Sequence, residues 1–150
     1  MSRLFKTRPD PDHSLAIMTT TEPTTHRGSC HCGAVRFSVE GQGSALGTAF
    51  GDAGVLACNC SMCGRAGSLM VFVVADRFTL DAGEAQLRDY QFGKGHIHHP
   101  FCSVCGIKPF AHGVDPESGA TMYAVNLRCV DGSDAQVLLA DANWYDGASL

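Results

Sequence analysis

Seven of the eight cysteines in this 150-residue chain fall into three short clusters, which constrain its fold more than any other feature. The clusters are Cys30-His31-Cys32, Cys58-Asn59-Cys60-Ser61-Met62-Cys63 and Cys102-Ser103-Val104-Cys105, called here the first, middle and third clusters. A closed tetrahedral zinc site takes four thiolates, whereas a catalytic zinc ion keeps three protein ligands and one open position. Seven ligands divide as four plus three. The count alone therefore indicates one structural zinc ion and a second zinc ion with an open position.

A disulfide framework is the main alternative for a chain with eight cysteines. The segment Met1–Met18 carries five charged side chains and no apolar stretch, so it does not resemble a secretory signal. The longest apolar run, Leu69–Ala75, is too short to span a membrane. The C-x-C and C-x-x-C spacings then favour metal binding in a reducing compartment. A thioredoxin-like role would require a βαβ context that the sequence does not show. We therefore expect a cytoplasmic zinc protein that crosses no membrane.

The composition argues for a β protein and against nucleic acid as a partner. The formal net charge is −4, and the chain has no Lys/Arg-rich arm, whereas nucleic-acid-binding domains carry a basic patch. Charged residues make up only 17% of the chain, and 17 residues are glycine. Many glycines with few helical patterns indicate a turn-rich, mainly β fold.

Three segments differ in character along the chain. Residues 1–25 are rich in Thr, Pro, Ser and Asp and are predicted to be a disordered leader, within which Met18 is an alternative start to Met1. Residues 26–135 are predicted to form the zinc-binding domain. Residues 136–150 are predicted to be a C-terminal strand or tail that packs on this domain.

Short apolar runs and period-2 alternation predict the strands, and the polar stretches between them predict turns. The predicted strands are 34–39, 69–74, 78–80, 87–92, 122–127 and 137–139. Only two short helices are expected, one after Cys60 and one after Asp131. The cysteines accordingly lie in the loops of a mainly β domain.

Spacing alone leaves the pairing of the clusters open. The first and third clusters can together make a closed four-thiolate site, and Gly106 suits the tight turn after Cys105. The pair Cys60/Cys63 could equally join the third cluster. The middle cluster can bind one ion with all three cysteines, or one of its cysteines can be buried while Cys129 or a histidine completes a second closed site.

The ordered motifs of the chain resemble those of the glutathione-dependent formaldehyde-activating family, which includes centromere protein V-like domains. The motifs are Gly28-Ser29-Cys30-His31-Cys32-Gly33-Ala34-Val35-Arg36-Phe37, the middle cluster, Tyr90-Gln91-Phe92-Gly93, Phe101-Cys102-Ser103-Val104-Cys105-Gly106-Ile107-Lys108-Pro109-Phe110 and Tyr123-Ala124-Val125-Asn126-Leu127-Arg128-Cys129. The resemblance covers about residues 27–132. It implies a β-tent fold, in which small antiparallel sheets gather around a structural zinc ion.

The resemblance also implies the two ligand sets. It assigns the structural zinc ion to Cys30, Cys32, Cys102 and Cys105, and the second zinc ion to Cys58, Cys60 and Cys63. The implied activity is that of a carbon–sulfur lyase or synthase that condenses glutathione with formaldehyde to S-hydroxymethylglutathione. Zinc deprotonates a coordinating thiol. Three thiolates leave the centre with a net charge of −1, which favours delivery of the thiol over polarisation of the carbonyl.

Glutathione carries two carboxylates, so a pocket for it requires Arg or Lys. The basic residues near the motifs are Arg65, Lys94, Lys108 and Arg128, and we expect Arg65, Asn126 and Arg128 to contact glutathione. In the family a basic residue commonly follows the third cysteine of the middle cluster, but here Gly64 stands there and Arg65 comes next. The cluster His96, His98 and His99 is interpreted as loop histidines, with an acid/base or third metal site as the alternatives.

Two other functions remain open at this stage. The chain could be a non-catalytic zinc-binding module that binds a partner, or a thiol or zinc sensor that uses the exposed middle cluster. A change in the coordination of the second metal on adding glutathione would separate the enzyme from the module. The expected partner is a small thiol, with no nucleic acid and no membrane, and the sequence does not define an oligomeric state.

Overall fold

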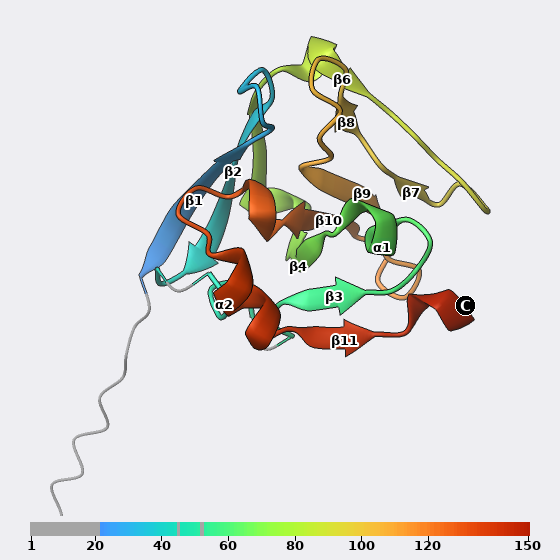
Figure 1. The fold of residues 1–150 in the computed structure, drawn as a ribbon. Helices are drawn as coiled ribbons and strands as arrows, with labels where there is room; N and C mark the ends of the chain where they lie inside the picture. The colour runs from blue at the N-terminus through green and yellow to red at the C-terminus, as the bar shows by residue number, and fades with distance from the viewer. Residues whose placement is uncertain (1–21, 45, 52) are drawn as a thin grey trace, which may run out of the picture.

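The computed structural model describes residues 22–44, 46–51 and 53–150, and it has a mainly β fold made of small sheets (Figure 1). The described residues form eleven strands, two α-helices and four short 3-10 helices. The sheets lean together toward the top of Figure 1, where β6 and β8 meet the β1–β2 connection. The predicted fold class, a mainly β protein of the β-tent type, is confirmed.

Most of the elements are short, as expected for a turn-rich chain. The strands are β1 (Pro23–Ser29), β2 (Arg36–Gln42), β3 (Leu56–Cys58), β4 (Leu69–Val74), β5 (Phe78–Ala82), β6 (Leu87–Arg88), β7 (Ile97–His98), β8 (Phe101–Cys102), β9 (Phe110–Val114), β10 (Thr121–Asn126) and β11 (Asn143–Tyr145). The α-helices are α1 (Cys63–Ala66) and α2 (Ala135–Ala140), and the 3-10 helices are η1 (Ala75–Arg77), η2 (Glu84–Gln86), η3 (Leu127–Cys129) and η4 (Gly147–Ser149).

Three sheets make up the fold. The order β1-β2-β5 forms an antiparallel sheet, β11-β3-β4-β10-β9-β7 forms a larger sheet, and β6 pairs with β8. In the larger sheet Val125 of β10 lies opposite Val71 of β4. The pairing of β11 with β3 is parallel, while the other pairs of this sheet are antiparallel. The C-terminal part of the chain thus completes one edge of the sheet beside Cys58.

The core lies between the two larger sheets. Alternate residues of β2, Phe37 and Val39, are fully buried, as the period-2 pattern of this segment predicts. Phe37 stacks on Phe78 of β5, and Phe78 stacks on Tyr123 of β10 with 4.1 Å between ring centroids. Aromatic pairs of this kind add to the stabilisation from apolar burial. They fix the two sheets relative to each other.

Two of the predicted strands differ from the structure. Residues 137–139 were predicted as a strand, and this is wrong because they belong to α2. The Asp134 carboxylate accepts hydrogen bonds from the backbone N–H groups of Gln136 and Val137 and so caps the helix. The segment predicted as a strand over 87–92 is extended only as β6. The short helices predicted after Cys60 and Asp131 are confirmed as α1 and α2.

The predicted end of the leader at residue 25 falls inside β1, which begins at Pro23. Residues 1–21 lie outside the described part of the chain. The division of the remainder at residue 135 stays a prediction. Among the described residues, none of the helices has the length and apolar character needed to cross a membrane.

Candidate metal centres and the adjoining groove

The structure brings the first and third clusters together at the top of the tent. The sulfur atoms of Cys30, Cys32, Cys102 and Cys105 all lie within 4.8 Å of one another. The Cys32 Sγ is 3.6 Å from the Cys30 Sγ and 3.7 Å from the Cys102 Sγ. Ligands on a tetrahedral zinc ion with bonds of 2.3 Å lie about 3.8 Å apart. A disulfide would bring the sulfurs to about 2.0 Å, so these are four free thiols spaced for one ion.

Two glycines shape the loops that carry this four-cysteine site. Gly33 and Gly106 each follow the second cysteine of a pair, and both have positive φ values, 76° and 78°. Without a Cβ these residues turn the chain sharply enough for both sulfurs of a pair to converge. The Gly106 N–H donates to the Cys102 carbonyl at 2.7 Å, as the predicted tight turn requires. Cys30 and Cys102 are fully buried, so the site is continuous with the core.

The thiols of this site do not titrate alike. The backbone N–H of Ile107 is the main reason that the pKa of Cys105 is lowered to about 6. For Cys32 the hydrogen bond at Ala34 lowers the pKa, but burial and the neighbouring sulfurs together outweigh it and raise the pKa to about 11. Several thiolates cannot ionise so close together without a cation to balance them. The donor set is therefore suited to a soft divalent ion.

The middle cluster forms a second site at the end of β3 and the start of α1. The sulfur atoms of Cys58, Cys60 and Cys63 lie within 4.8 Å of one another, and all three residues are partly exposed. The backbone N–H of Cys60 donates to the Cys58 Sγ at 3.4 Å, and that of Cys63 donates to the Cys60 Sγ at 3.3 Å. These bonds orient the sulfurs toward one point, and no fourth cysteine or histidine joins this group in the described chain.

One helical turn holds this site in shape. The Gly64 N–H donates to the Cys60 carbonyl at 2.9 Å, and the Gly67 N–H donates to the Cys63 carbonyl at 2.9 Å. Gly67 ends α1 with φ 61°, a left-handed conformation that glycine adopts without steric penalty. Burial raises the pKa of Cys63 to about 12. A bound cation would reverse this effect, because a metal ion deprotonates a coordinating thiol.

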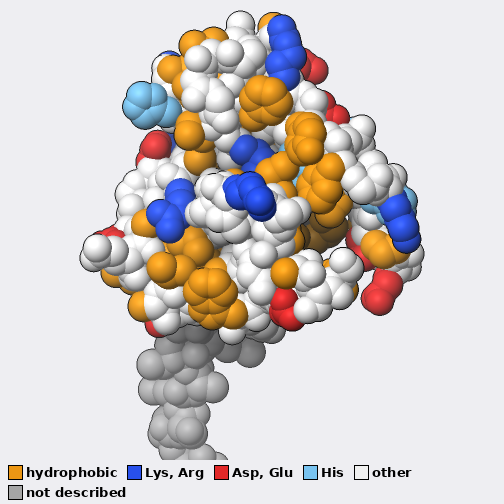
Figure 2. All heavy atoms as spheres, turned by 45° about the vertical axis from the view of Figure 1, so that its right-hand side comes forward, with side chains coloured by type: hydrophobic (Ala, Val, Ile, Leu, Met, Phe, Trp, Pro, Cys, Tyr) orange, Lys and Arg blue, Asp and Glu red, His pale blue; other side chains and the backbone are white. Residues whose placement is uncertain are grey.

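A groove opens beside the middle cluster. It consists of two adjoining hollows of about 430 and 370 Å³ that share Met62, Ala66 and Tyr90. Arg65 lines one hollow and Lys108 the other. Figure 2 shows basic side chains flanked by hydrophobic ones on the face that holds α1. Volumes of this size are typical of sites for small molecules.

Lys108 lines the groove, although the sequence favoured Arg65, Asn126 and Arg128 as the glutathione contacts. Its side chain is half-buried, and burial lowers its pKa, while the nearby Cys63 and Cys60 oppose this effect. The Nζ atom lies 3.5 Å from Nδ1 of His99, a buried histidine whose ring stacks on Phe92. Lys108 lies three residues after Cys105, so the segment that leaves the four-cysteine site leads directly to the three-cysteine site.

The three predicted glutathione contacts occupy different surroundings. Arg65 is exposed at the groove, and its guanidinium donates to the Ser61 carbonyl at 2.9 Å. Asn126 is buried, and its side chain bonds the backbone of Leu69 and Arg128. The Arg128 side chain is exposed beyond the end of β10. The structure therefore brings Arg65 to the groove, while contacts of Asn126 and Arg128 with glutathione stay predictions.

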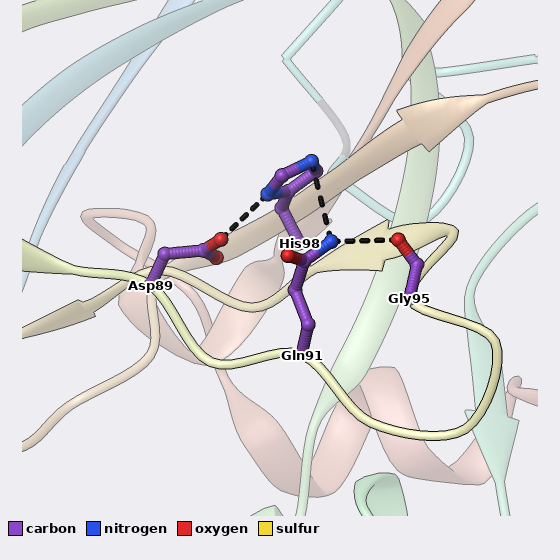
Figure 3. A network of polar contacts seen from close by, with 4 residues as sticks. All are labelled: Asp89, Gln91, Gly95 and His98. Carbon is purple, nitrogen blue, oxygen red and sulfur yellow. Dashed lines mark hydrogen bonds and ion pairs between the residues drawn. The ribbon is translucent and has the colours of Figure 1, made fainter.

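The histidines 96, 98 and 99 do not form one group. The His98 Nδ1 lies 2.6 Å from Asp89 Oδ2, and Gln91 Nε2 lies 3.4 Å from the His98 Nε2 (Figure 3). A neutral ring with its proton on Nδ1 donates to Asp89 and accepts from Gln91. Gln91 also donates to the Gly95 carbonyl and so closes the loop before β7. This network is partly exposed and braces a loop, whereas His99 lies in the groove.

This chain is similar to known proteins in both sequence and structure. The model of the family named glutathione-dependent formaldehyde-activating enzyme matches residues 25–145. A solved crystal structure of a Rhodobacter sphaeroides protein, a target of the Northeast Structural Genomics group, shares 29% sequence identity with this chain. The similarity covers 79% of this chain and 99% of that chain, with a TM-score of 0.64.

Proposed function

Because this chain belongs to the glutathione-dependent formaldehyde-activating family, we propose that it is a zinc-dependent carbon–sulfur lyase or synthase acting on glutathione adducts. The reaction joins the glutathione sulfur to the carbon of formaldehyde and gives S-hydroxymethylglutathione. The thiol proton ends on the former carbonyl oxygen, so the addition needs no oxidant or reductant. The single observation that carries the proposal is a three-cysteine cluster that borders a groove lined by two cations.

The proposed zinc ligands follow from the donor sets. Cys30, Cys32, Cys102 and Cys105 supply four thiolates for a closed structural site. Cys58, Cys60 and Cys63 supply three, which leaves one position for the sulfur of a substrate. Zinc bound there would lower the pKa of the glutathione thiol and hold it as a thiolate, the nucleophilic form.

The protein side chains would bind and orient glutathione in the groove. Lys108 and Arg65 can each pair with one of the two carboxylates of the tripeptide. Tyr90 and Phe92 offer apolar contact surface along the same hollow. This arrangement binds the substrate by its ends, so the thiol in the middle is directed toward the cysteines at the start of α1.

Lys108 has a second role in this proposal. Three thiolates and a fourth sulfur would give the second zinc centre a net negative charge, and Lys108 supplies a nearby positive charge. An ammonium group interacts strongly with thiolates when both are partly removed from water. Its packing against the buried His99 limits the positions that the ammonium group can take.

The first experiment counts zinc per chain by elemental analysis, in the native protein and in Cys60→Ser, with Cys129→Ser as the control. Cys129 belongs to neither of the two proposed metal sites. We expect two zinc ions in the native protein and the control, and about one in Cys60→Ser with the fold retained. One zinc ion in all three proteins would contradict a metal in the middle cluster and favour a binding module.

The second experiment replaces zinc by cobalt and adds glutathione. Cobalt–thiolate absorption bands should change in the native protein, because a new sulfur enters the open position. The rate of S-hydroxymethylglutathione formation, followed by NMR exchange, should exceed the spontaneous rate. Unchanged bands and a spontaneous rate would contradict the enzyme and support a zinc-binding module or a sensor. The cytoplasmic location stays a prediction from the sequence.

A further inference from the structure

The C-terminal turn of the chain packs directly against the three-cysteine site. After β11 the chain forms η4, which lies beside the end of β3 in Figure 1. A Cβ atom added to Gly147 would lie 2.6 Å from the Cys58 Sγ and 3.0 Å from the Cys60 Cβ. Real Cβ atoms essentially never come as close to another atom as the first of these distances, and the second is tight. The backbone of this turn therefore touches two of the three proposed ligands.

Asn59, which stands between two of these cysteines, holds the turn in place. Its Nδ2 donates to Asp146 Oδ1 at 2.8 Å, and its Oδ1 accepts from the Ala148 N–H at 2.9 Å. Its backbone N–H donates to the Tyr145 carbonyl at 3.3 Å. One residue of the ligand loop thus makes three hydrogen bonds, to Tyr145 and Asp146 before Gly147 and to Ala148 after it. The side chain of Ser149 closes the turn by bonding the Asp146 carboxylate.

The sheet sets where this turn begins. Tyr145 of β11 lies opposite Cys58 of β3 in parallel register, so the residue after Tyr145 emerges beside the ligand loop. The match to the family model ends at residue 145. The residues Asp146–Ser149 therefore lie outside the matched segment, although they pack against the proposed second metal site.

The turn and the groove approach the middle cluster at different residues. Gly147 contacts Cys58 and Cys60, whereas the groove is bounded by Met62, at the start of α1, and by Lys108, whose charge acts on Cys63. We propose that the turn Asp146–Ser149 is a fixed shield over the Cys58–Cys60 side of the second metal site. It leaves the groove as the route by which thiols reach the open position.

This inference rests on the proposed second zinc ion, and it assigns positioning roles to Asn59 and Gly147. A side chain at position 147 would displace the Cys58 sulfur. Because this sulfur is a proposed metal ligand, its displacement would distort the coordination of the second zinc ion. Partners that orient metal ligands from outside the ligand set commonly change metal affinity by about 10- to 100-fold when they are mutated. The shield also keeps competing ligands in solution away from two of the sulfurs.

The test measures how fast each zinc ion is lost to the chromogenic chelator 4-(2-pyridylazo)resorcinol, using the full chain. The variants are Asp146→Ala, Asn59→Ala and Gly147→Ala. The controls are Asp115→Ala, a partly exposed aspartate that bonds Ser118 as Asp146 bonds Ser149, and Gly47→Ala, where nothing lies within 4 Å. We expect the second zinc ion to leave about tenfold faster or more in the variants, with the slow phase of the structural zinc ion unchanged.

The outcomes separate the shield from the proposed function. Two zinc ions in the native protein with unchanged release in all three variants would overturn the shield and leave the proposed enzyme standing. One zinc ion in the native protein would count against the proposed function. In that case alkylation of Cys58 by iodoacetamide, read by peptide mass spectrometry, tests the shield. The rate should rise several-fold in Asp146→Ala, and an unchanged rate would overturn it.

Discussion

The Asn126 side chain donates a hydrogen bond from Nδ2 to the backbone carbonyl of Lys108 at 3.4 Å. Its Oδ1 accepts from the backbone N–H of Leu69 at 3.3 Å. Leu69 begins β4, shortly after α1 and the three-cysteine site, while Lys108 follows the four-cysteine site. One buried amide therefore connects the backbone segments beside the two proposed metal sites, and it fixes where Lys108 enters the groove.

Replacing this amide should destabilise the protein. Asn126→Ala leaves the buried Leu69 N–H and the partly buried Lys108 carbonyl without this partner, and an unsatisfied buried group costs about 1–3 kcal/mol. We expect a loss of at least this size in the free energy of unfolding, measured by urea titration of the zinc-loaded protein. Asn143→Ala removes an exposed Asn that bonds the Ala53 carbonyl and is the matched control. Equal stability losses in the two variants would contradict the role of Asn126.

Replacing Gly28, which lies two residues before Cys30 of the four-cysteine site, should also lower the free energy of unfolding. A Cβ atom at this position would lie 2.3 Å from the Phe37 Cζ and 2.5 Å from the Cys129 carbonyl oxygen. Phe37 is fully buried, so its ring has no free space to move into. Gly28→Ala should therefore cost about 1–3 kcal/mol, as overpacking of a core does.

Thermal unfolding of Gly28→Ala and of Gly47→Ala is the measurement. Gly47 has open space around its Cα, and its φ is not in the left-handed region, so its substitution should leave the melting temperature nearly unchanged. A Gly28→Ala protein as stable as this control would show that the β1–β2 sheet can shift away from η3.

The sequence was most informative where chemistry and short-range geometry coincide. The cysteine spacings predicted three local clusters, because C-x-C and C-x-x-C loops converge locally, and the resemblance to the family implied the two ligand sets that the structure brings together. The alternation of Phe37 and Val39 likewise predicted a half-buried strand. The strand predicted at 137–139 was wrong because three consecutive apolar residues are compatible with either a strand or one helical turn. The hydrogen bonds to the Asp134 side chain favour the helix.

The groove could not be predicted, because its walls come from segments far apart in the sequence. Met62, Tyr90 and Lys108 meet only when α1, the loop after β6 and the segment after β8 are folded together. Asn126 was selected from a motif for substrate contact, but its buried amide is fully engaged with backbone groups. The sequence marks Lys108 as one of four basic residues near the motifs, three residues after the last cysteine of the third cluster, and does not place it in the groove.

The two groove cations should control binding of glutathione more than turnover. A charge-assisted hydrogen bond contributes about 1.5–3 kcal/mol, so Lys108→Met should raise KM for glutathione about tenfold or more. Arg65→Ala should raise KM less, because Arg65 is exposed and its pairing is screened by water. Arg128→Ala tests the remaining basic contact that the sequence predicted.

Steady-state kinetics with Lys94→Met as the control checks this prediction. Lys94 is an exposed lysine in the loop before β7. KM values for Lys108→Met and Arg65→Ala that match the control would contradict glutathione binding in this groove. A fall in kcat for Lys108→Met without a change in KM would instead assign Lys108 to stabilisation of the thiolate centre.

Stability should also depend on pH through His112 of β9. Burial is the main cause that lowers its pKa below the ordinary value of 6.5, and the neighbouring His98 acts in the same direction. The His98 ring stacks on the His112 ring with centroids 4.6 Å apart. In the folded protein His112 therefore resists protonation, while the unfolded chain takes up the proton more readily. The stability from neutral His112 is present above pH 6.5 and is lost as the pH falls below it.

The measurement compares the free energy of unfolding of the native protein and His112→Gln at several pH values from about 8 to about 5. The cysteine sites titrate in both proteins, so their contribution cancels in the difference. His112→Gln should be less stable at the upper end, where it lacks the ring stacking, and should lose less stability on acidification. Parallel curves for the two proteins would show that His112 protonates equally well in the folded and unfolded chains, and would contradict this prediction.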